Sequence, residues 1–258
     1  MTPISLVKPW IDAARLRRRF SRGGVDAFAR REQLVRELAP GKSFLDAGGM
    51  WLLNGKVAFE AERAGASSVT ELDGMDPTEE FTERQRSSSV RFVQGDVHDP
   101  GTIEAVGPHD VVWCTGLLYH TPNPFLVLQH LRQLCRGHLL LGTRVIPEVP
   151  GIEQACVFYP GLPPGAGRAY AAHDPNPAGL TGVGTPFDTT PNMGYGNFWW
   201  GMSPSAVRGM LRTAGFEPVE EIRPDPFSID VVALAAREPS FIPEPGFSRR
   251  RGLEGSSQ

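Results

Sequence analysis

The hydrophobic pattern becomes regular at Ser43, where short apolar runs begin to alternate with segments of helical periodicity. Runs that are almost wholly apolar predict strands covered on both faces, as in a mainly parallel sheet. Five such runs occur, at residues 43–47, 68–73, 90–96, 109–115 and 138–143. Their alternation with helices predicts an α/β protein.

Two helices are marked by their ends as well as by their apolar faces. Asn123 is a suitable N-cap, and Pro124 suits the first helical position. Ser203 and Pro204 repeat this arrangement, and Gly215 marks the end of the second helix. The first helix is expected to run as far as the apolar position 135.

Two further strands, at residues 216–222 and 228–236, complete the regular pattern. We therefore predict a doubly wound, Rossmann-like α/β fold, with a mainly parallel seven-stranded sheet and helices on both faces. Between the second and third strands, the sequence indicates only an acidic polar segment that reaches Ser89. Regular structure is expected to resume at Ser203 after a long interruption.

This interruption, at residues 150–197, is rich in proline and glycine and shows no helical or strand period. A loop of this length in a compact domain is usually functional or disordered. Its aromatic residues favour an ordered lid inserted into an α/β domain at 42–238. Residues 1–41 are expected to form a basic helical extension, with a helix at about 25–38, and residues 239–258 a disordered tail.

Overall charge and composition narrow the function only modestly. The net charge of −3 gives no general attraction to nucleic acid or to anionic membranes. No apolar run approaches a membrane span, and residues 1–10 lack a signal-peptide core, so we expect a soluble cytoplasmic protein. The three cysteines are too few and too scattered for a disulfide framework or a zinc site, and we expect Cys114 and Cys135 to pack in the core.

Acidic residues and glycines recur where successive predicted strands end. Asp46, Gly48 and Gly49 close the first strand, Asp73 closes the second, and Asp96 closes the third. The carboxyl ends of strands in an open α/β sheet line the crevice in which ligands bind. We therefore expect these residues to share one binding site.

Each of these positions suits one part of an adenosyl ligand that carries a sulfonium and an ammonium group. Gly48 and Gly49 allow the backbone to approach closely, and Asp46 supplies negative charge. Asp73 can accept hydrogen bonds from ribose hydroxyls, and Asp96 can accept one from the adenine amino group. The chain contains neither the G-x-G-x-x-G of nicotinamide-binding domains nor a phosphate-binding G-x-x-x-x-G-K-[ST], which disfavours dehydrogenases and kinases.

The ordered motifs FLDAGG, VTELD, VRFVQGD, HDVVWCTGLLYHTPNP and LLLGT resemble those of class I methyltransferases that use S-adenosylmethionine, across residues 43–236. The resemblance implies that Asp46, Gly48 and Gly49 hold the methionine end of the cofactor. It also implies that Asp73 holds the ribose and Asp96 the adenine. Segments GLLYHTPNP and NFWWGMSPSAVRGMLRTAGF are similar to the tRNA wobble-uridine carboxymethyltransferases, in which a tyrosine at the position of Tyr119 faces the donor group.

Three departures from these families change the expectation. Met50 and Leu52 stand where the superfamily has its later glycines, which makes the loop bulkier and lets Asp76 compete with Asp73 for the ribose. Thr121-Pro122 and the segment PDPFSIDV replace arginines of the carboxymethyltransferases. Without those arginines a carboxylated donor lacks a counter-charge, so ordinary S-adenosylmethionine is the expected cofactor.

His120 is the leading candidate for a general base, because it follows the fourth strand and histidine titrates near neutral pH. A histidine there can equally be a loop or helix-cap residue, and Tyr119 can line the donor pocket or simply pack. His173, in the expected lid, is a weaker candidate base. His98 beside Asp99 suggests a metal, but no third ligand follows, and no metal site is expected.

Aromatic residues Phe198, Trp199 and Trp200 lie where the expected lid rejoins the domain. They could form an apolar wall for the methyl acceptor, stack on a base, or pack in the core.

The leading hypothesis is an O- or N-methyltransferase for a small-molecule metabolite. The alternative is a tRNA wobble-uridine (carboxymethyl)transferase, to which an arginine cluster between residues 15 and 22 could contribute phosphate contacts. A third hypothesis is a non-catalytic protein that binds the cofactor. The sequence does not predict the oligomeric state.

Overall fold

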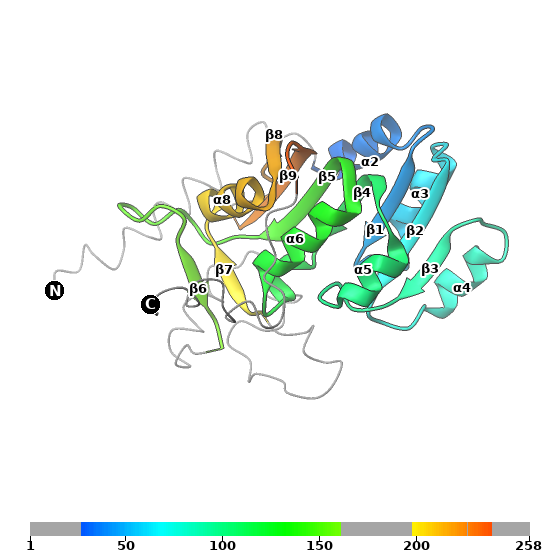
Figure 1. Cartoon of the computed structure of the whole chain (residues 1–258), viewed down its shortest axis with the longest axis horizontal. Coiled ribbons are helices and arrows are strands. Elements are labelled where there is room, and N and C mark those ends of the chain that lie inside the picture. The colour runs from blue at the N-terminus through cyan, green and yellow to red at the C-terminus, as the bar shows by residue number, and fades with distance from the viewer. Residues whose placement is uncertain (1–26, 161–197, 226, 239–258) are drawn as a thin grey trace, which may run out of the picture.

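The computed structural model of the 258-residue chain describes residues 27–160, 198–225 and 227–238 (Figure 1). The helices are α2 (Ala27–Leu38), α3 (Lys56–Arg63), α4 (Glu79–Gln85), α5 (Pro100–Val106), the 3₁₀ helix η1 (Leu118–His120), α6 (Pro124–Leu134) and α8 (Pro204–Ala214). The strands are β1 (Ser43–Ala47), β2 (Ser68–Asp73), β3 (Arg91–Gln94), β4 (His109–Thr115), β5 (Cys135–Arg144), β6 (Cys156–Phe158), β7 (Trp200–Met202), β8 (Phe216–Ile222) and β9 (Ser228–Ala235).

Seven strands form one sheet in the order β3-β2-β1-β4-β5-β9-β8. Strands β1 to β5 are parallel, and β9 runs antiparallel to both of its neighbours, β5 and β8. The predicted doubly wound fold is confirmed. The chain moves outward from β1 to β2 and β3, then returns to place β4 on the other side of β1. This change of direction makes the carboxyl ends of β1 and β4 the switch point of the sheet.

Helices cover both faces of the sheet (Figure 1). Successive side chains of β4 alternate between two cores: Val112 and Cys114 lie in the cluster that contains residues of α5, α6 and α8. Val111 and Trp113 lie in the opposite cluster, with residues of α2, α3 and α4. Because successive side chains of a strand point to opposite faces of the sheet, the one apolar strand β4 contributes to both hydrophobic cores.

The local signals for α8 correspond to its observed ends. The Ser203 hydroxyl accepts a hydrogen bond from the N–H of Ala206, Pro204 opens the helix, and Gly215 ends it in a left-handed conformation. Pro124 also opens α6 as predicted, but the Asn123 side chain makes no cap hydrogen bond.

The sequence patterns were wrong in three places. Cys135 does not end α6 but begins β5, because the chain turns directly from helix to strand. The acidic segment after β2 contains α4, which Thr78 caps and which buries Phe81 alone. Residues 156–158 and 200–202 pair as the antiparallel strands β6 and β7, so regular structure begins before Ser203. The rest of the expected lid, residues 161–197, lies outside the described residues.

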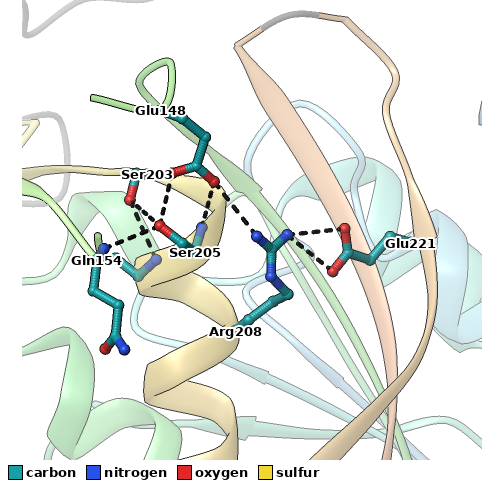
Figure 2. A network of polar contacts seen from close by, with 7 residues as sticks. Glu148, Gln154, Ser203, Ser205, Arg208 and Glu221 are labelled. Atoms are coloured by element: carbon teal, nitrogen blue, oxygen red, sulfur yellow. Dashed lines mark hydrogen bonds and ion pairs between the residues drawn. The ribbon is translucent and has the colours of Figure 1, made fainter. Parts of the chain in front are cut away.

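A polar network fixes the start of α8 to the segment between β5 and β6 (Figure 2). Glu148 accepts hydrogen bonds from the backbone N–H and the hydroxyl of Ser205, at 2.8 and 2.7 Å. The backbone N–H of Gln154 donates to the Ser205 hydroxyl. Arg208 contacts Glu148 at 3.5 Å and Glu221 of β8 at 3.2 Å. We call these residues, together with Ser203, the α8 network.

Helix α2 is joined to the opposite face of the sheet by two ion pairs. Arg31 donates two hydrogen bonds of 2.7 Å to the fully buried Asp230 of β9, and Arg30 donates two to Glu220 of β8. The helix expected near residues 25–38 is therefore present as α2, while the arginines between residues 15 and 22 lie outside the described part of the chain. Among the residues that the structure describes, no helix is long and apolar enough to cross a membrane.

Candidate functional site

The loops that follow β1, β2 and β4 meet at the switch point of the sheet. The N–H of Gly48 donates to the carbonyl of Leu72 at 2.8 Å. Gly48 has a φ of +87°, and a Cβ there would lie 3.4 Å from the Leu117 side chain, which follows β4. Both its left-handed conformation and its close neighbour therefore favour glycine at position 48.

Three buried carboxyl groups surround this turn. Asp46 of β1 and Glu71 and Asp73 of β2 are 2%, 0% and 9% exposed, respectively. The N–H of Gly49 donates to Glu71 Oε1 at 3.0 Å, and the N–H of Met50 donates to Asp73 Oδ2 at 2.9 Å. Carboxylates from β2 thus hold the turn that follows β1, and we call Asp46, Glu71 and Asp73 the acidic triad.

Glu71 is the residue of this triad that the sequence reasoning missed. The signal was present, because a glutamate interrupts a strand whose other interior positions are mostly apolar. Charged residues are almost never fully buried unless they are paired or serve a specific purpose. A glutamate inside a predicted buried strand is therefore a reason to look for an acidic partner or a backbone donor.

Burial raises the pKa values of all three acids, and the charge of a neighbouring acid raises those of Asp46 and Glu71 further. Loss of solvent raises the pKa of Asp46 from 3.8 to about 7, with further upward contributions from the charges of Asp73 and Glu60. Burial, then the negative charge of Asp46, raises the pKa of Glu71 well above its usual value. Burial also raises the pKa of Asp73, although backbone N–H donors, first that of Met75, oppose this effect.

The loop that follows Gly49 adopts its shape without the later glycines of the methyltransferase motif. Met50 is fully buried, and its methyl group lies 3.4 Å from the position of a Cβ on Gly55. Leu52 has a φ of +61°, a conformation that costs a non-glycine residue roughly 1–2 kcal/mol. Trp51 and Leu52 are both exposed, so the loop presents an apolar surface at this end of the sheet.

The two other acidic candidates lie along the same rim. Asp96 follows β3, and its Oδ1 accepts the backbone N–H of His98 at 2.8 Å, with the ring Nδ1 of His98 at the same distance. Asp76 accepts a hydrogen bond from Gln94 at 2.8 Å. The partner of His98 is therefore Asp96, while Asp99 caps helix α5.

Metal binding was the alternative interpretation of His98. Within residues 27–160, 198–225 and 227–238, no group of three or more His, Cys, Asp or Glu residues is arranged to hold a metal ion.

Tyr119 and His120 lie beyond the end of β4 in the helix η1. The Tyr119 ring centroid is 4.8 Å from that of Phe198 and 4.2 Å from that of His120, and His120 and Phe198 are 5.0 Å apart. The N–H of Trp199 donates to the carbonyl of Tyr119, and the indole of Trp200 donates to the carbonyl of Pro122. The two segments thus form one aromatic cluster, made of Tyr119, His120 and Phe198.

The predicted site residues fall into two groups. Asp46, Gly48, Gly49 and Asp73 lie together around the turn after β1, and Asp96 follows β3, the strand beside β2. Tyr119 and His120 follow Leu117, which packs beside Gly48. His173 lies outside the described residues.

A separate groove of about 370 Å³ lies at the opposite, amino ends of the strands. It is lined in part by Ser43, Ser68 and His109, which are the first residues of β1, β2 and β4. It therefore does not belong to the candidate site.

No family model and no curated protein matches the sequence. Solved structures match the fold. The N-terminal domain of EvdMO1, determined in the presence of SAH and D-fucose, is 19% identical, with a TM-score of 0.53 over 81% of this chain and 82% of that one. The 1,6-didemethyltoxoflavin-N1-methyltransferase of Burkholderia thailandensis is 16% identical, with a TM-score of 0.55 over 92% of each chain.

The chain has the fold of these two structures, the second of which is a methyltransferase. The second of them contains bound 1,6-didemethyltoxoflavin and S-adenosylhomocysteine. At such low identity the likeness concerns the fold.

Proposed function

We propose that the protein is an S-adenosylmethionine-dependent methyltransferase that modifies an oxygen or nitrogen atom of a small molecule. The observation that carries the proposal is the turn of Gly48 and Gly49 at the switch point, held by carboxylates of β2. It occupies the place where the fold binds ligands, at the carboxyl ends of the strands. Structures with the same fold contain S-adenosylhomocysteine or were solved with SAH.

The residues at the rim fit such a cofactor. A side chain at position 48 would fill the space between the turn and Leu117. Because Gly48 has none, the backbone of the turn would stay accessible to the methionine end of the ligand. Asp73 accepts two backbone N–H groups, yet a carboxylate has about four acceptor positions and keeps capacity for ribose hydroxyls. Asp96 would accept from the adenine amino group.

Asp46 would act on the cofactor indirectly. Its carboxyl group lies beneath Gly49, where a Cβ would be only 2.5 Å from its Oδ2. We therefore assign Asp46 to the support of the turn and to the negative potential around it, rather than to a direct contact.

The aromatic cluster would form the acceptor side of the site. The cofactor, when bound, supplies a methyl group already activated by a sulfonium. The chain would position the acceptor and exclude water, and positioning of this kind can lower a barrier by roughly 7–11 kcal/mol. His120 would take the proton of an O–H or N–H acceptor, a role that typically contributes about 10²–10⁴-fold. Tyr119 and Phe198 would form the apolar wall beside it.

Calorimetric titration with S-adenosylmethionine and S-adenosylhomocysteine tests the proposal. We expect wild-type protein to bind both and Asp73→Ala to bind both at least about tenfold more weakly, which corresponds to about 1.4 kcal/mol. Glu83→Gln, which removes an exposed carboxylate paired with Arg86, is the matched control and should bind as the wild type does. Failure of the wild type to bind either compound would exclude a methyltransferase.

Turnover separates the enzyme from the non-catalytic alternative. With a panel of hydroxylated and amino-containing metabolites, we expect S-adenosylhomocysteine to accumulate, and His120→Ala to reduce its formation while leaving cofactor binding unchanged. Cofactor binding without turnover on any acceptor would favour a protein that only binds the cofactor.

The tRNA-modifying alternative gains no support from the comparisons. The arginines that would contact phosphates lie outside the described residues, and Thr121 uses its hydroxyl to donate to the carbonyl of Leu118. RNA binding would weaken steeply with salt, which a filter-binding series at increasing salt would detect. The cytoplasmic location expected from the sequence stays a prediction.

A further inference from the structure

Two oxygen atoms of the acidic triad lack a donor. Oδ2 of Asp46 and Oε2 of Glu71 are buried, and no N–H or hydroxyl group of the described residues donates to either of them. Buried polar atoms without a hydrogen bond cost on the order of 1–3 kcal/mol, so each such atom in a folded protein requires an explanation.

The two atoms face the same point of the backbone. A Cβ on Gly49 would lie 2.5 Å from Asp46 Oδ2 and 2.9 Å from Glu71 Oε2, with Glu71 Oε1 at 2.7 Å. The two carboxyl groups therefore converge beneath a glycine that has no side chain to separate them. No other residue type fits at position 49 without displacing one of the acids.

The surroundings of the pair are acidic. The other titratable groups that interact with it come from three elements: Asp73 of β2, Glu60 of α3 and Cys114 of β4. Lys56, the lysine of α3, lies 3.5 Å from Glu60 and 3.9 Å from Glu32. Two ionised carboxylates in this environment would repel each other, and none of the basic side chains that the structure describes pairs with them.

Burial makes a proton the counter-charge that this pair accommodates most readily. Asp46 and Glu71 are only 2% and 0% exposed, and their oxygens lie 2.5–2.9 Å from the position of a Cβ on Gly49. A proton needs no additional space between the two carboxyl groups. Carboxylates placed this close together commonly share one proton.

We propose that Asp46 and Glu71 share a proton, and that this protonated pair holds the Gly48–Met50 turn in the shape that receives the cofactor. Glu71 carries the proton and donates it to Asp46, while its Oε1 accepts the N–H of Gly49. Glu71 is thus a positioning residue that acts through Gly49. The cofactor part of the inference rests on the proposed function, whereas the shared proton rests on the geometry alone.

The arrangement makes the turn sensitive to pH. When the pH rises and the proton leaves, the two carboxylates repel each other and Gly49 loses its fixed support. Cofactor affinity should therefore fall on the alkaline side. The acceptor side of the site, built by the aromatic cluster, has no part in this effect.

Glu71→Gln tests the inference, because its amide can donate to Asp46 permanently and its carbonyl oxygen can still accept from Gly49. The affinities of wild type and variant for S-adenosylhomocysteine are measured by calorimetry from about pH 6 to about pH 9. We expect the wild-type affinity to fall at least about tenfold relative to that of the variant. This is the loss that follows when the pH rises one unit above the pKa of the pair and the affinity follows its protonated fraction. Both proteins meet the same ligand, so titration of the ligand itself cancels in the ratio. Equal pH slopes for the two proteins would overturn the proposal.

A spectroscopic measurement on the wild type covers the case in which the variant does not fold. The infrared C=O stretch of a buried protonated carboxyl group should be present at neutral pH and disappear at alkaline pH. Absence of that band at neutral pH would overturn the shared proton. A wild type that shows the band but binds no cofactor would retain the shared proton and exclude the proposed function.

Discussion

The protein contains two clusters of carboxylates that are built in opposite ways. In the α8 network, Glu148 and Glu221 lie near the surface, and each contacts Arg208, with Ser205 as a further donor to Glu148 (Figure 2). In the acidic triad, Asp46 and Glu71 are buried, and within the described part of the chain neither has a basic partner and each keeps one oxygen without a donor. The first cluster contains a basic side chain between its carboxylates, whereas none of the described basic residues pairs with Asp46 or Glu71.

The difference separates structural from functional use of the same side chains. Exposed ion pairs with a compensating arginine contribute about 0–1 kcal/mol each and mainly fix the position of neighbouring segments. Buried acids with strongly shifted pKa values concentrate at sites of function. The triad also lies at the switch point of the sheet, whereas the α8 network lies beside the segment that leads into β6. The comparison therefore points to the triad as the part of the molecule that supports the proposed ligand site.

The largest effect is expected from Gly49→Ala, which breaks the triad directly. The new Cβ would lie 2.5–2.9 Å from three carboxyl oxygens of Asp46 and Glu71, so the turn has to move. We expect cofactor binding to disappear from calorimetry and the unfolding free energy to fall by about 1–3 kcal/mol, as for other overpacked sites.

Gly116→Ala is the matched control for this change. It follows β4 on the same rim and has a φ of +84°, but nothing lies within 4 Å of its Cβ position. It should cost about 1 kcal/mol of stability, through backbone conformation alone, and leave cofactor binding nearly intact. If Gly49→Ala bound the cofactor as tightly as Gly116→Ala does, the triad would not support the cofactor site.

The next effect concerns the pH dependence of stability. The pKa of Asp46 is about 7 in the folded protein and 3.8 ordinarily. Between about pH 4 and pH 7 the folded state binds more protons than the unfolded state, so the unfolding free energy falls as the pH rises. The raised pKa of Glu71 extends this loss above neutral pH.

Urea denaturation at a series of pH values measures this slope. The contribution should be fully present below about pH 4, where the group is protonated in both states, and Glu71→Gln should flatten the profile above neutral pH. A wild-type profile that rises from pH 5 to pH 8 would show that paired carboxylates elsewhere outweigh the triad. A profile unchanged by Glu71→Gln would show that Glu71 holds no proton.

The smallest effect is expected from Arg208→Ala in the α8 network. It removes the contacts with Glu148 and Glu221, but both carboxylates remain accessible to water, so the loss should be about 0–1 kcal/mol and decrease with added salt. Cofactor affinity should not change. Thermal unfolding at low and high salt checks the first expectation and calorimetry the second, and a large loss of cofactor affinity would mean that the α8 network also shapes the binding site.

Some elements follow from local chemistry and were predicted for that reason. Ser203, Pro204 and Gly215 mark the ends of α8 because caps and fixed dihedrals act within a few residues. Helix α4 was missed because only Phe81 is buried on it, too little for an apolar face to be recognised. Strands β6 and β7 were missed because three-residue strands exist only through pairing with a distant segment.

The candidate site divides in the same way. The positions of Asp46, Gly48, Gly49 and Asp73 at strand ends could be predicted, because parallel strands bring their carboxyl ends to one edge. The role of Glu71 could not be predicted. The pattern of apolar and polar positions gives the face of the sheet on which a side chain lies, but not the group that this side chain contacts. That Asp46 lies beneath Gly49 also depends on the packing of β1 against β2.

The sequence by itself determined the alternation of buried strands and helices, the order of the acids along the chain and the ends of its best-marked helix. These properties depend on periodicity and on contacts between near neighbours. The tertiary structure alone decided that two acids from different strands converge away from every basic side chain of the described residues, and that Tyr119 meets Phe198. Such pairings depend on how distant segments dock, and in the low-dielectric interior a shared proton is our proposed counter-charge for the buried acids.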